Sequence, residues 1–200
     1  MGAADSVYNT ANRDRHTRSG FIARWHLRSV NEAIYQLVSE SGARSVLDAG
    51  CGEGFVTDYL ARRDPSLALT GIDVSSEAID YARKNFGHAS FLVGSVLALP
   101  FGDASYDTVL CSEVLEHIPD WEQAITELKR VARHYVLITV PREPHFKVLN
   151  SLGRATRFCQ DPGHINFWSW ASFKRIISAR FSGTRFERKH VIYQLALGRV

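Results

Sequence analysis

The chain has 200 residues, of which 45% are hydrophobic and 22% charged, so it is long enough to bury the core of one globular domain. Its three cysteines show neither a metal-binding nor a redox spacing, and no apolar run is long enough to cross a bilayer, which excludes a disulfide scaffold and a membrane-spanning protein. The first twenty residues lack the apolar stretch of a signal peptide, so we expect a cytoplasmic protein with free thiols.

The charge of the chain is unevenly distributed, although its net value is only +3. From Ser41 to Val140 there are 8 Lys/Arg and 14 Asp/Glu, a net charge of −6. From Pro141 to Val200 there are 11 Lys/Arg and 3 Asp/Glu, a net charge of +8. A basic second half favours an anionic partner, such as a carboxylate, a phosphate or nucleic acid, and a solvated basic face without a partner is the alternative.

The elements expected in chain order begin with a polar arm over 1–20 and a helix over 21–40, which has apolar residues at helical spacing and ends at Ser41-Gly42. Strand and helix patterns then alternate. The expected strands lie near 45–49, 68–73, 89–93, 106–111, 134–140, 181–187 and 190–198. The further expected helices lie near 54–62, 76–84, 120–131 and 169–179. This alternation predicts an α/β fold with a parallel sheet and helices on both faces.

A glycine-rich turn follows the first expected strand, in the run VLDAGCGEG at 46–54. Glycine lets the backbone turn sharply and approach a ligand closely, and a helix N-terminus with its free N–H groups follows. The run lacks the Lys and Ser/Thr of a P-loop and differs from the dinucleotide pattern G-x-G-x-x-G. The glycines alternate after an acid, Asp48, which predicts a nucleotide-type site.

A second acid, Asp73, ends the next expected strand. A carboxylate about twenty residues after a glycine loop is placed to accept hydrogen bonds from the hydroxyls of a ribose. Ligands of such sheets bind beyond the carboxyl ends of the strands, where both features lie.

Four segments in this order resemble the class I S-adenosylmethionine (SAM) methyltransferases, of the methyltransferase type 11 and ubiquinone-pathway O-methyltransferase kind. They are DAGCGEG from Asp48, GIDVS from Gly71, FLVGSVLALPF from Phe91 and DTVLCSEVLEHIPDW from Asp107. The resemblance implies a Rossmann-like, doubly wound sheet of seven strands, mostly parallel with an antiparallel last strand. It also implies SAM as cofactor and S-adenosylhomocysteine (SAH) as product. We expect one domain over 1–200, with an N-terminal arm and helix over 1–40 and a cap over the acceptor site at 142–168.

The resemblance also implies the residues that contact the cofactor. They are Asp48, Gly50, Cys51, Gly52, Asp73, Val74, Ser95, Val96 and Glu113. Asp73 would bind the ribose, Val74 would cover the adenine, and Asp48 would either meet the methionine ammonium through water or brace the loop. Ser95 departs from the acid usual in the family, and its hydroxyl can still accept a hydrogen bond from the adenine amino group.

The sequence after the fourth strand motif holds the candidate catalytic residues Glu113, Glu116 and His117. Spacings of three and four residues place side chains on one face of a helical turn. With His164, the set resembles that of two metal-using subgroups, the ubiquinone-pathway O-methyltransferases and the small-RNA 2′-O-methyltransferases. Carried over by position, the ligands of a divalent ion such as Mg²⁺ or Mn²⁺ would be Glu113, Glu116, His117 and His164. The alternatives are a metal-free general base or substrate contact at His117, and purely structural roles.

The resemblance favours methyl transfer to a small-molecule acceptor at oxygen, because the chain is short and shows no added RNA- or protein-binding domain. Residues 142–168 are rich in basic and aromatic side chains, which suits an anionic or aromatic acceptor, and packing of the aromatic residues in the core is the alternative. An RNA 2′-O-methyltransferase and a non-catalytic SAM-binding partner subunit are the alternatives. We expect no membrane partner, and the acceptor, the methylated atom and the oligomeric state stay open.

Overall fold

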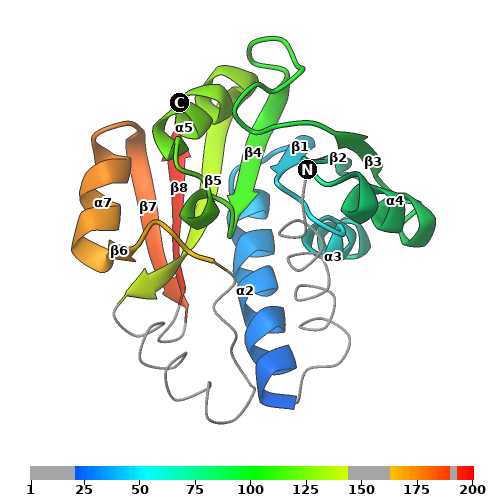
Figure 1. Cartoon of the computed structure of the whole chain (residues 1–200), viewed down its shortest axis with the longest axis horizontal. Helices are drawn as coiled ribbons and strands as arrows, with labels where there is room; N and C mark the ends of the chain where they lie inside the picture. The colour runs from blue at the N-terminus through cyan, green and yellow to red at the C-terminus, as the bar shows by residue number, and fades with distance from the viewer. Residues whose placement is uncertain (1–20, 144–162, 190–192) are drawn as a thin grey trace.

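The computed structural model describes residues 21–143, 163–189 and 193–200, which form a twisted sheet with helices on both faces (Figure 1). The helices are α2 (Phe21–Glu40), α3 (Phe55–Arg63), α4 (Ser76–Asn85), the 3-10 turn η1 (Leu115–His117), α5 (Trp121–Val131) and α7 (Trp170–Ser178). The strands are β1 (Ser45–Ala49), β2 (Ala68–Asp73), β3 (Ser90–Val93), β4 (Tyr106–Ser112), β5 (Ala132–Glu143), β6 (Trp168–Ser169), β7 (Ser182–Lys189) and β8 (Tyr193–Arg199). The predicted arm at 1–20 and most of the predicted cap lie outside the described residues.

The main sheet has the strand order β3-β2-β1-β4-β5-β8-β7. The strands β1 to β5 pair in parallel, and β8 runs antiparallel to both β5 and β7. This confirms the prediction of seven strands, mostly parallel with an antiparallel last strand. The structure adds β6, a two-residue strand that pairs with Arg142 and Glu143 of β5 and is too short to leave a sequence pattern.

The two faces of the sheet bury separate cores, because successive side chains of a strand point to opposite faces. In β1, Leu47 belongs to the core shared with α5 and α7, and Val46 belongs to the core shared with α2 and α3. Adjacent residues of β4 and β5 divide in the same way. Helix α4 packs a smaller cluster through Ile79 and Ala82. Each large apolar side chain that is fully buried contributes about 2 kcal/mol.

The local sequence explains where several elements begin and end. Gly42 has a φ of 67° and ends α2, as predicted. Ser75 begins α4, because its hydroxyl accepts a hydrogen bond from the backbone N–H of Ala78 at 3.2 Å. The prediction of β5 from residue 134 was too short, since Ala132 is already extended and follows the last residue of α5 without a loop.

The carboxyl ends of the parallel strands meet at one edge of the sheet. This edge carries the glycine loop after β1, Asp73 at the end of β2, Glu113 after β4 and Arg142 near the end of β5. The loop that precedes β6 also returns to this edge, because β6 pairs with the end of β5. The fold therefore brings the segments singled out in the sequence to one side of the molecule.

Candidate functional site

The glycine loop after β1 is bonded to the end of β2 through its own backbone. Gly50, Gly52 and Gly54 have φ values of 84°, 52° and 81°, a region that favours glycine. The N–H groups of Gly50 and Cys51 donate to the carbonyl oxygen of Ile72 at 2.7 and 3.0 Å. A Cβ on Gly50 would lie 2.4 Å from a methyl group of Val114, so the loop also passes closely beneath the turn that follows β4.

Asp73 accepts hydrogen bonds from the loop with one carboxylate oxygen and from its own turn with the other. The donors are the backbone N–H groups of Gly52 and Ser75, both at 2.9 Å. Burial raises the pKa of Asp73, and these hydrogen bonds oppose the rise. Each carboxylate oxygen has a second lone pair, so Asp73 can also accept hydrogen bonds from a ribose. The neighbouring Val74 is 75% exposed, which leaves its side chain available to an adenine ring.

Asp48 lies beneath the glycine loop, where it is buried. Its Oδ2 atom accepts a hydrogen bond from the Thr57 hydroxyl at 2.6 Å, which connects β1 to the first turn of α3. Burial raises the pKa of Asp48 to about 6, the Thr57 hydrogen bond lowers it, and the charge of Asp73 adds to the rise. Of the two roles considered for Asp48, this geometry supports the bracing of the loop.

The other residues expected to contact the cofactor, Cys51, Val96 and Ser95, differ in whether a side chain or only the backbone is accessible to a ligand. The side chains of Cys51 and Val96 are buried, so these two residues offer only backbone groups to a ligand. The Ser95 hydroxyl accepts a hydrogen bond from the N–H of Leu97 at 3.2 Å, and its remaining lone pair can serve an adenine amino group.

The turn after β4 is not the helical turn that the spacing of Glu113, Glu116 and His117 predicted. Only Leu115–His117 is helical, as a 3-10 turn, and Glu113 has a φ of 55°. The Glu113 N–H donates to the Thr139 carbonyl at 3.0 Å, and its carboxylate accepts a hydrogen bond from the Tyr193 hydroxyl at 3.5 Å. Glu113 is thus separated from the other two residues by a change in backbone direction.

Hydrogen bonds hold the loop before β6 against η1, and Asn166 donates most of them. The Asn166 amide donates to the carbonyl oxygens of Leu115 and Ile118 at 2.9 and 2.7 Å. The backbone N–H groups of Ile165 and Asn166 both donate to the Glu116 carbonyl, at 2.9 and 3.0 Å. These bonds place His164 opposite η1, although the two segments are about fifty residues apart in the sequence.

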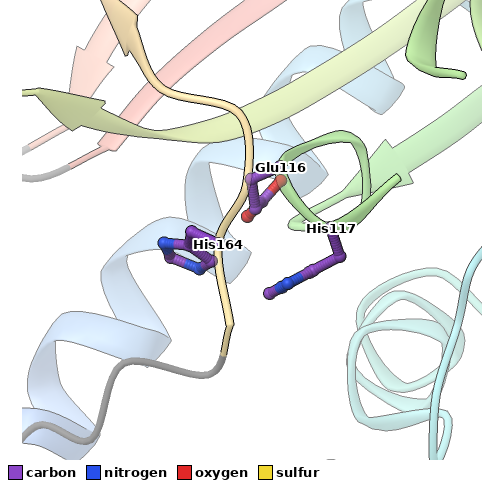
Figure 2. Close-up of side chains that lie close together, drawn as sticks. All are labelled: Glu116, His117 and His164. Atoms are coloured by element: carbon purple, nitrogen blue, oxygen red, sulfur yellow. The ribbon is translucent and has the colours of Figure 1, made fainter. Parts of the chain in front are cut away.

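Glu116, His117 and His164 therefore face one another, as Figure 2 shows. Each residue offers one ligand atom, and the three atoms lie within 4.8 Å of one another. The two imidazole rings are 4.7 Å apart, and both carboxylate oxygens of Glu116 are buried. Among the described residues, Glu113 does not join this group, so the structure brings together three of the four predicted metal ligands.

Two residues of the site were missing from the sequence-based set. Asn166 holds the loop that carries His164 in place, and the only feature of the sequence that could have indicated this role is its position two residues after that histidine. Tyr193 reaches Glu113 from β8, and nothing in the sequence around it indicates that contact.

Residues 47–138 match the family described as a methyltransferase domain. A demethylmenaquinone methyltransferase of Thermotoga maritima is 32% identical over 114 residues, which cover 57% of this chain and 48% of that protein. A fatty-acid O-methyltransferase of Mycolicibacterium smegmatis is 36% identical over 92 residues, which cover 45% of this chain and 34% of that protein. The chain thus spans less than half the length of these curated relatives.

The fold agrees with these matches. The crystal structure of magnesium protoporphyrin IX methyltransferase from Synechocystis PCC 6803, with bound SAH, aligns with a TM-score of 0.73 and 18% identity, covering 98% of this chain and 97% of that one. Residues 47–138 thus resemble the domain of the SAM-dependent methyltransferases, and the fold of the chain is the Rossmann-like fold of class I methyltransferase structures. Among the described residues, no helix has the length and apolar character needed to cross a membrane.

Proposed function

We propose that this methyltransferase transfers the methyl group of SAM to an oxygen atom of a small-molecule acceptor. The observation that carries the proposal is the placement of Glu116, His117 and His164 at the carboxyl edge of the sheet, beside the glycine loop and Asp73. Side chains that can take up a proton thus lie at the same edge as the cofactor residues.

The cofactor would lie along the glycine loop. Asp73 binds the ribose hydroxyls, Val74 covers the adenine, and Ser95 and the backbone of Val96 line the adenine edge. The N–H groups of Gly50, Cys51 and Gly52 approach the methionine part, and Glu113 lies on the acceptor side. Bound SAM supplies a methyl group on a positively charged sulfur.

The chain's own residues align the acceptor and remove its proton. In the transfer, the bond between carbon and sulfur breaks, its electron pair stays on sulfur to give SAH, and an acceptor oxygen forms the new bond to carbon. The hydroxyl proton passes to the imidazole of His117, and the nearby carboxylate of Glu116 stabilises the resulting positive charge. Alignment of the reacting atoms supplies much of the rate enhancement, because the methyl donor is already reactive.

As an alternative to proton transfer to His117, the same three side chains fit a divalent metal ion, since a carboxylate and two imidazoles converge within 4.8 Å. Glu116, His117 and His164 would hold it. Two imidazoles and a single carboxylate suit Mn²⁺ or Zn²⁺ better than Mg²⁺, which prefers oxygen ligands. The ion would supply positive charge that lowers the pKa of an acceptor hydroxyl.

The small-molecule class is supported by the two curated relatives, which are named for demethylmenaquinone and fatty-acid substrates. An RNA acceptor is the second candidate, since the carboxylate and the two histidines belong to the set implied by the resemblance to RNA 2′-O-methyltransferases. A non-catalytic SAM-binding subunit is the third.

Transfer of labelled methyl from SAM into fractionated cell extract, with and without chelator, tests these proposals. We expect label in the small-molecule fraction, and a loss of label in chelator would support the metal ion. Chelator-sensitive label in RNA would favour the second candidate. Bound SAM without label in any fraction would favour the third.

Variants connect the activity to the site. We expect His117→Ala and Glu116→Gln each to lower the transfer rate about 100-fold while leaving the affinity for SAH unchanged. Glu77→Gln, at an exposed position of α4, is the matched control and should keep full activity. Normal transfer by His117→Ala would exclude His117 as the base.

A further inference from the structure

Arg142, near the carboxyl end of β5, differs from the other arginines of the described chain. Its side chain is partly buried, and its Nε atom is fully buried without a hydrogen-bond partner. None of the ion pairs among the described residues includes Arg142. By contrast, several arginines at other positions pair with acids, namely Arg62, Arg63, Arg83, Arg130, Arg133, Arg180 and Arg185.

The backbone on both sides of Arg142 is held by its neighbours. Arg142 pairs with Trp168 in the short ladder between β5 and β6. The amide of Gln194 donates to the carbonyl oxygens of Pro141 and Trp168, at 3.3 and 3.0 Å. These bonds fix the position of the backbone from which the Arg142 side chain extends.

A second polar atom at the same junction is also unsatisfied. The side chain of Gln194 is completely buried, and its Oε1 atom has no hydrogen-bond partner. Buried polar groups are nearly always hydrogen-bonded, so a donor and an acceptor left unsatisfied at one junction call for an explanation. A bound ligand that supplies both partners would remove the cost of burying them.

The junction borders the place where the acceptor would lie. Trp168, the partner of Arg142, is four residues after His164 in the loop that Asn166 holds against η1. The Glu113 N–H donates to the carbonyl of Thr139, three residues before Arg142 in the same strand. The end of β5 that carries Arg142 therefore adjoins both the segment that carries Glu113 and the segment that carries His164.

We propose that Arg142 binds an anionic group of the methyl acceptor, a carboxylate or a phosphate, and so selects acidic acceptors. This inference rests on the proposed function, because it names the acceptor class of the same site. A guanidinium forms paired, charge-assisted hydrogen bonds with such groups. Gln194 Oε1 accepts a hydrogen bond from a donor group of the same ligand. The net charge of +8 over Pro141–Val200 further favours the approach of an anion.

The first experiment measures anion binding directly, by NMR of arginine Nε–H groups in the SAH-bound protein. The probes are benzoate and benzamide, which have the same shape and differ in charge. We expect the Arg142 signal, assigned by its loss in Arg142→Lys, to shift saturably with benzoate and not with benzamide. The signals of Arg133, which pairs with Asp107, and of the exposed Arg175 serve as internal controls. No shift at Arg142, or an equal shift at Arg175, would overturn the proposal.

The second experiment uses the acceptor fraction that takes up label from SAM. Arg142→Gln should raise KM for the acceptor about 10- to 100-fold, with a smaller change in kcat and an unchanged affinity for SAH, because one charge-assisted contact is lost. Arg175→Gln removes the same charge from α7 and should change neither constant. If Arg142→Gln transfers label with an unchanged KM, the anion proposal fails and the proposed function stands. If no fraction takes up label, the benzoate titration still decides whether Arg142 binds anions.

Discussion

The glycine loop and the turn at 113–117 lie at the same edge of the sheet, but different bonds hold them in place. The loop is held by backbone N–H groups that donate to Ile72 and to Asp73, about twenty residues away. The turn is held by the amide side chain of Asn166, about fifty residues away, and contains the left-handed Glu113. A site built on backbone geometry tolerates few changes at its glycines, whereas a site built on side chains can be altered one contact at a time.

The largest effect is expected at Gly50, where Gly50→Val tests how closely the loop depends on its backbone. A valine would have to adopt a φ of 84° and place its Cβ 2.4 Å from Val114. We expect a loss of about 4 kcal/mol in the free energy of unfolding, from backbone strain and overpacking. Chemical denaturation measures this loss, and calorimetry should show no residual SAH binding.

The matched control for Gly50 is Gly87→Ala, because Gly87 has no neighbour within 4 Å of an added Cβ and no positive φ. It should change the stability by less than about 0.5 kcal/mol. The double variant Gly50→Ala/Val114→Ala should bind SAH more tightly than Gly50→Ala alone, since it removes the methyl groups that clash. SAH binding by Gly50→Val at the original affinity would show that the loop does not depend on this close approach.

The second prediction concerns Asp48 beneath the loop, whose pKa is raised to about 6 by burial. The folded protein holds this proton more tightly than the unfolded chain, so Asp48 lowers stability as the pH rises from about 4 to above 6. Asp48→Asn removes the titration and keeps a partner for the Thr57 hydroxyl. Its stability relative to the original chain should therefore increase by about 3 kcal/mol between pH 4 and pH 7, at 1.36 kcal/mol per pKa unit.

Urea unfolding of both proteins at four pH values measures this difference. Asp64→Asn is a suitable comparison, because hydrogen bonds from Ser66 lower the pKa of that exposed acid. It should not reproduce the gain at neutral pH. A stability difference for Asp48→Asn that stays constant from pH 4 to pH 7 would exclude a raised pKa.

The third prediction concerns Asn166, which holds the loop of His164 against the turn at 113–117. Asn166→Ala leaves the carbonyl groups of Leu115 and Ile118 without this donor, at a cost of about 2 kcal/mol. We expect a lower rate of methyl transfer and weaker binding of Mn²⁺, with an unchanged affinity for SAH, because His164 loses its fixed position opposite His117. Asn85→Ala removes a similar amide-to-carbonyl bond in α4 and should leave all three quantities unchanged. Equal losses of SAH and Mn²⁺ binding in Asn166→Ala would contradict the separation of the two regions.

This separation also explains what could be predicted from the sequence. The positions of the strands, the glycine loop and Asp73 depend on local patterns, namely apolar runs, turn glycines and a strand-end acid, whereas the strand number and the antiparallel last strand were implied by the family resemblance. The left-handed Glu113 could not be predicted, because its conformation comes from its contact with β5 rather than from its own residue type. The roles of Asn166 and Tyr193 depend on contacts with residues 51 and 80 positions away, which no local pattern records.

The last prediction concerns Glu113→Gly, for which we expect a small increase in the free energy of unfolding. A residue other than glycine with a φ of 55° is strained by about 1 kcal/mol, and such strain persists where function maintains it. Glu113→Gly should therefore stabilise the protein by up to about 1 kcal/mol, since the bond from Tyr193 that it removes is long, at 3.5 Å. The same substitution should slow methyl transfer, because the carboxylate on the acceptor side is lost.

Ala104 supplies the matched control, because it has a φ of 51° in an exposed turn away from the site. Ala104→Gly should give a similar gain in thermal denaturation and leave methyl transfer unchanged. The pair separates strain from function, since both variants relieve the same backbone conformation and only one removes a side chain of the site. If Glu113→Gly stabilised the protein and kept full activity, the strain at Glu113 would reflect the packing of the turn alone, and Glu113 would leave the set of catalytic residues.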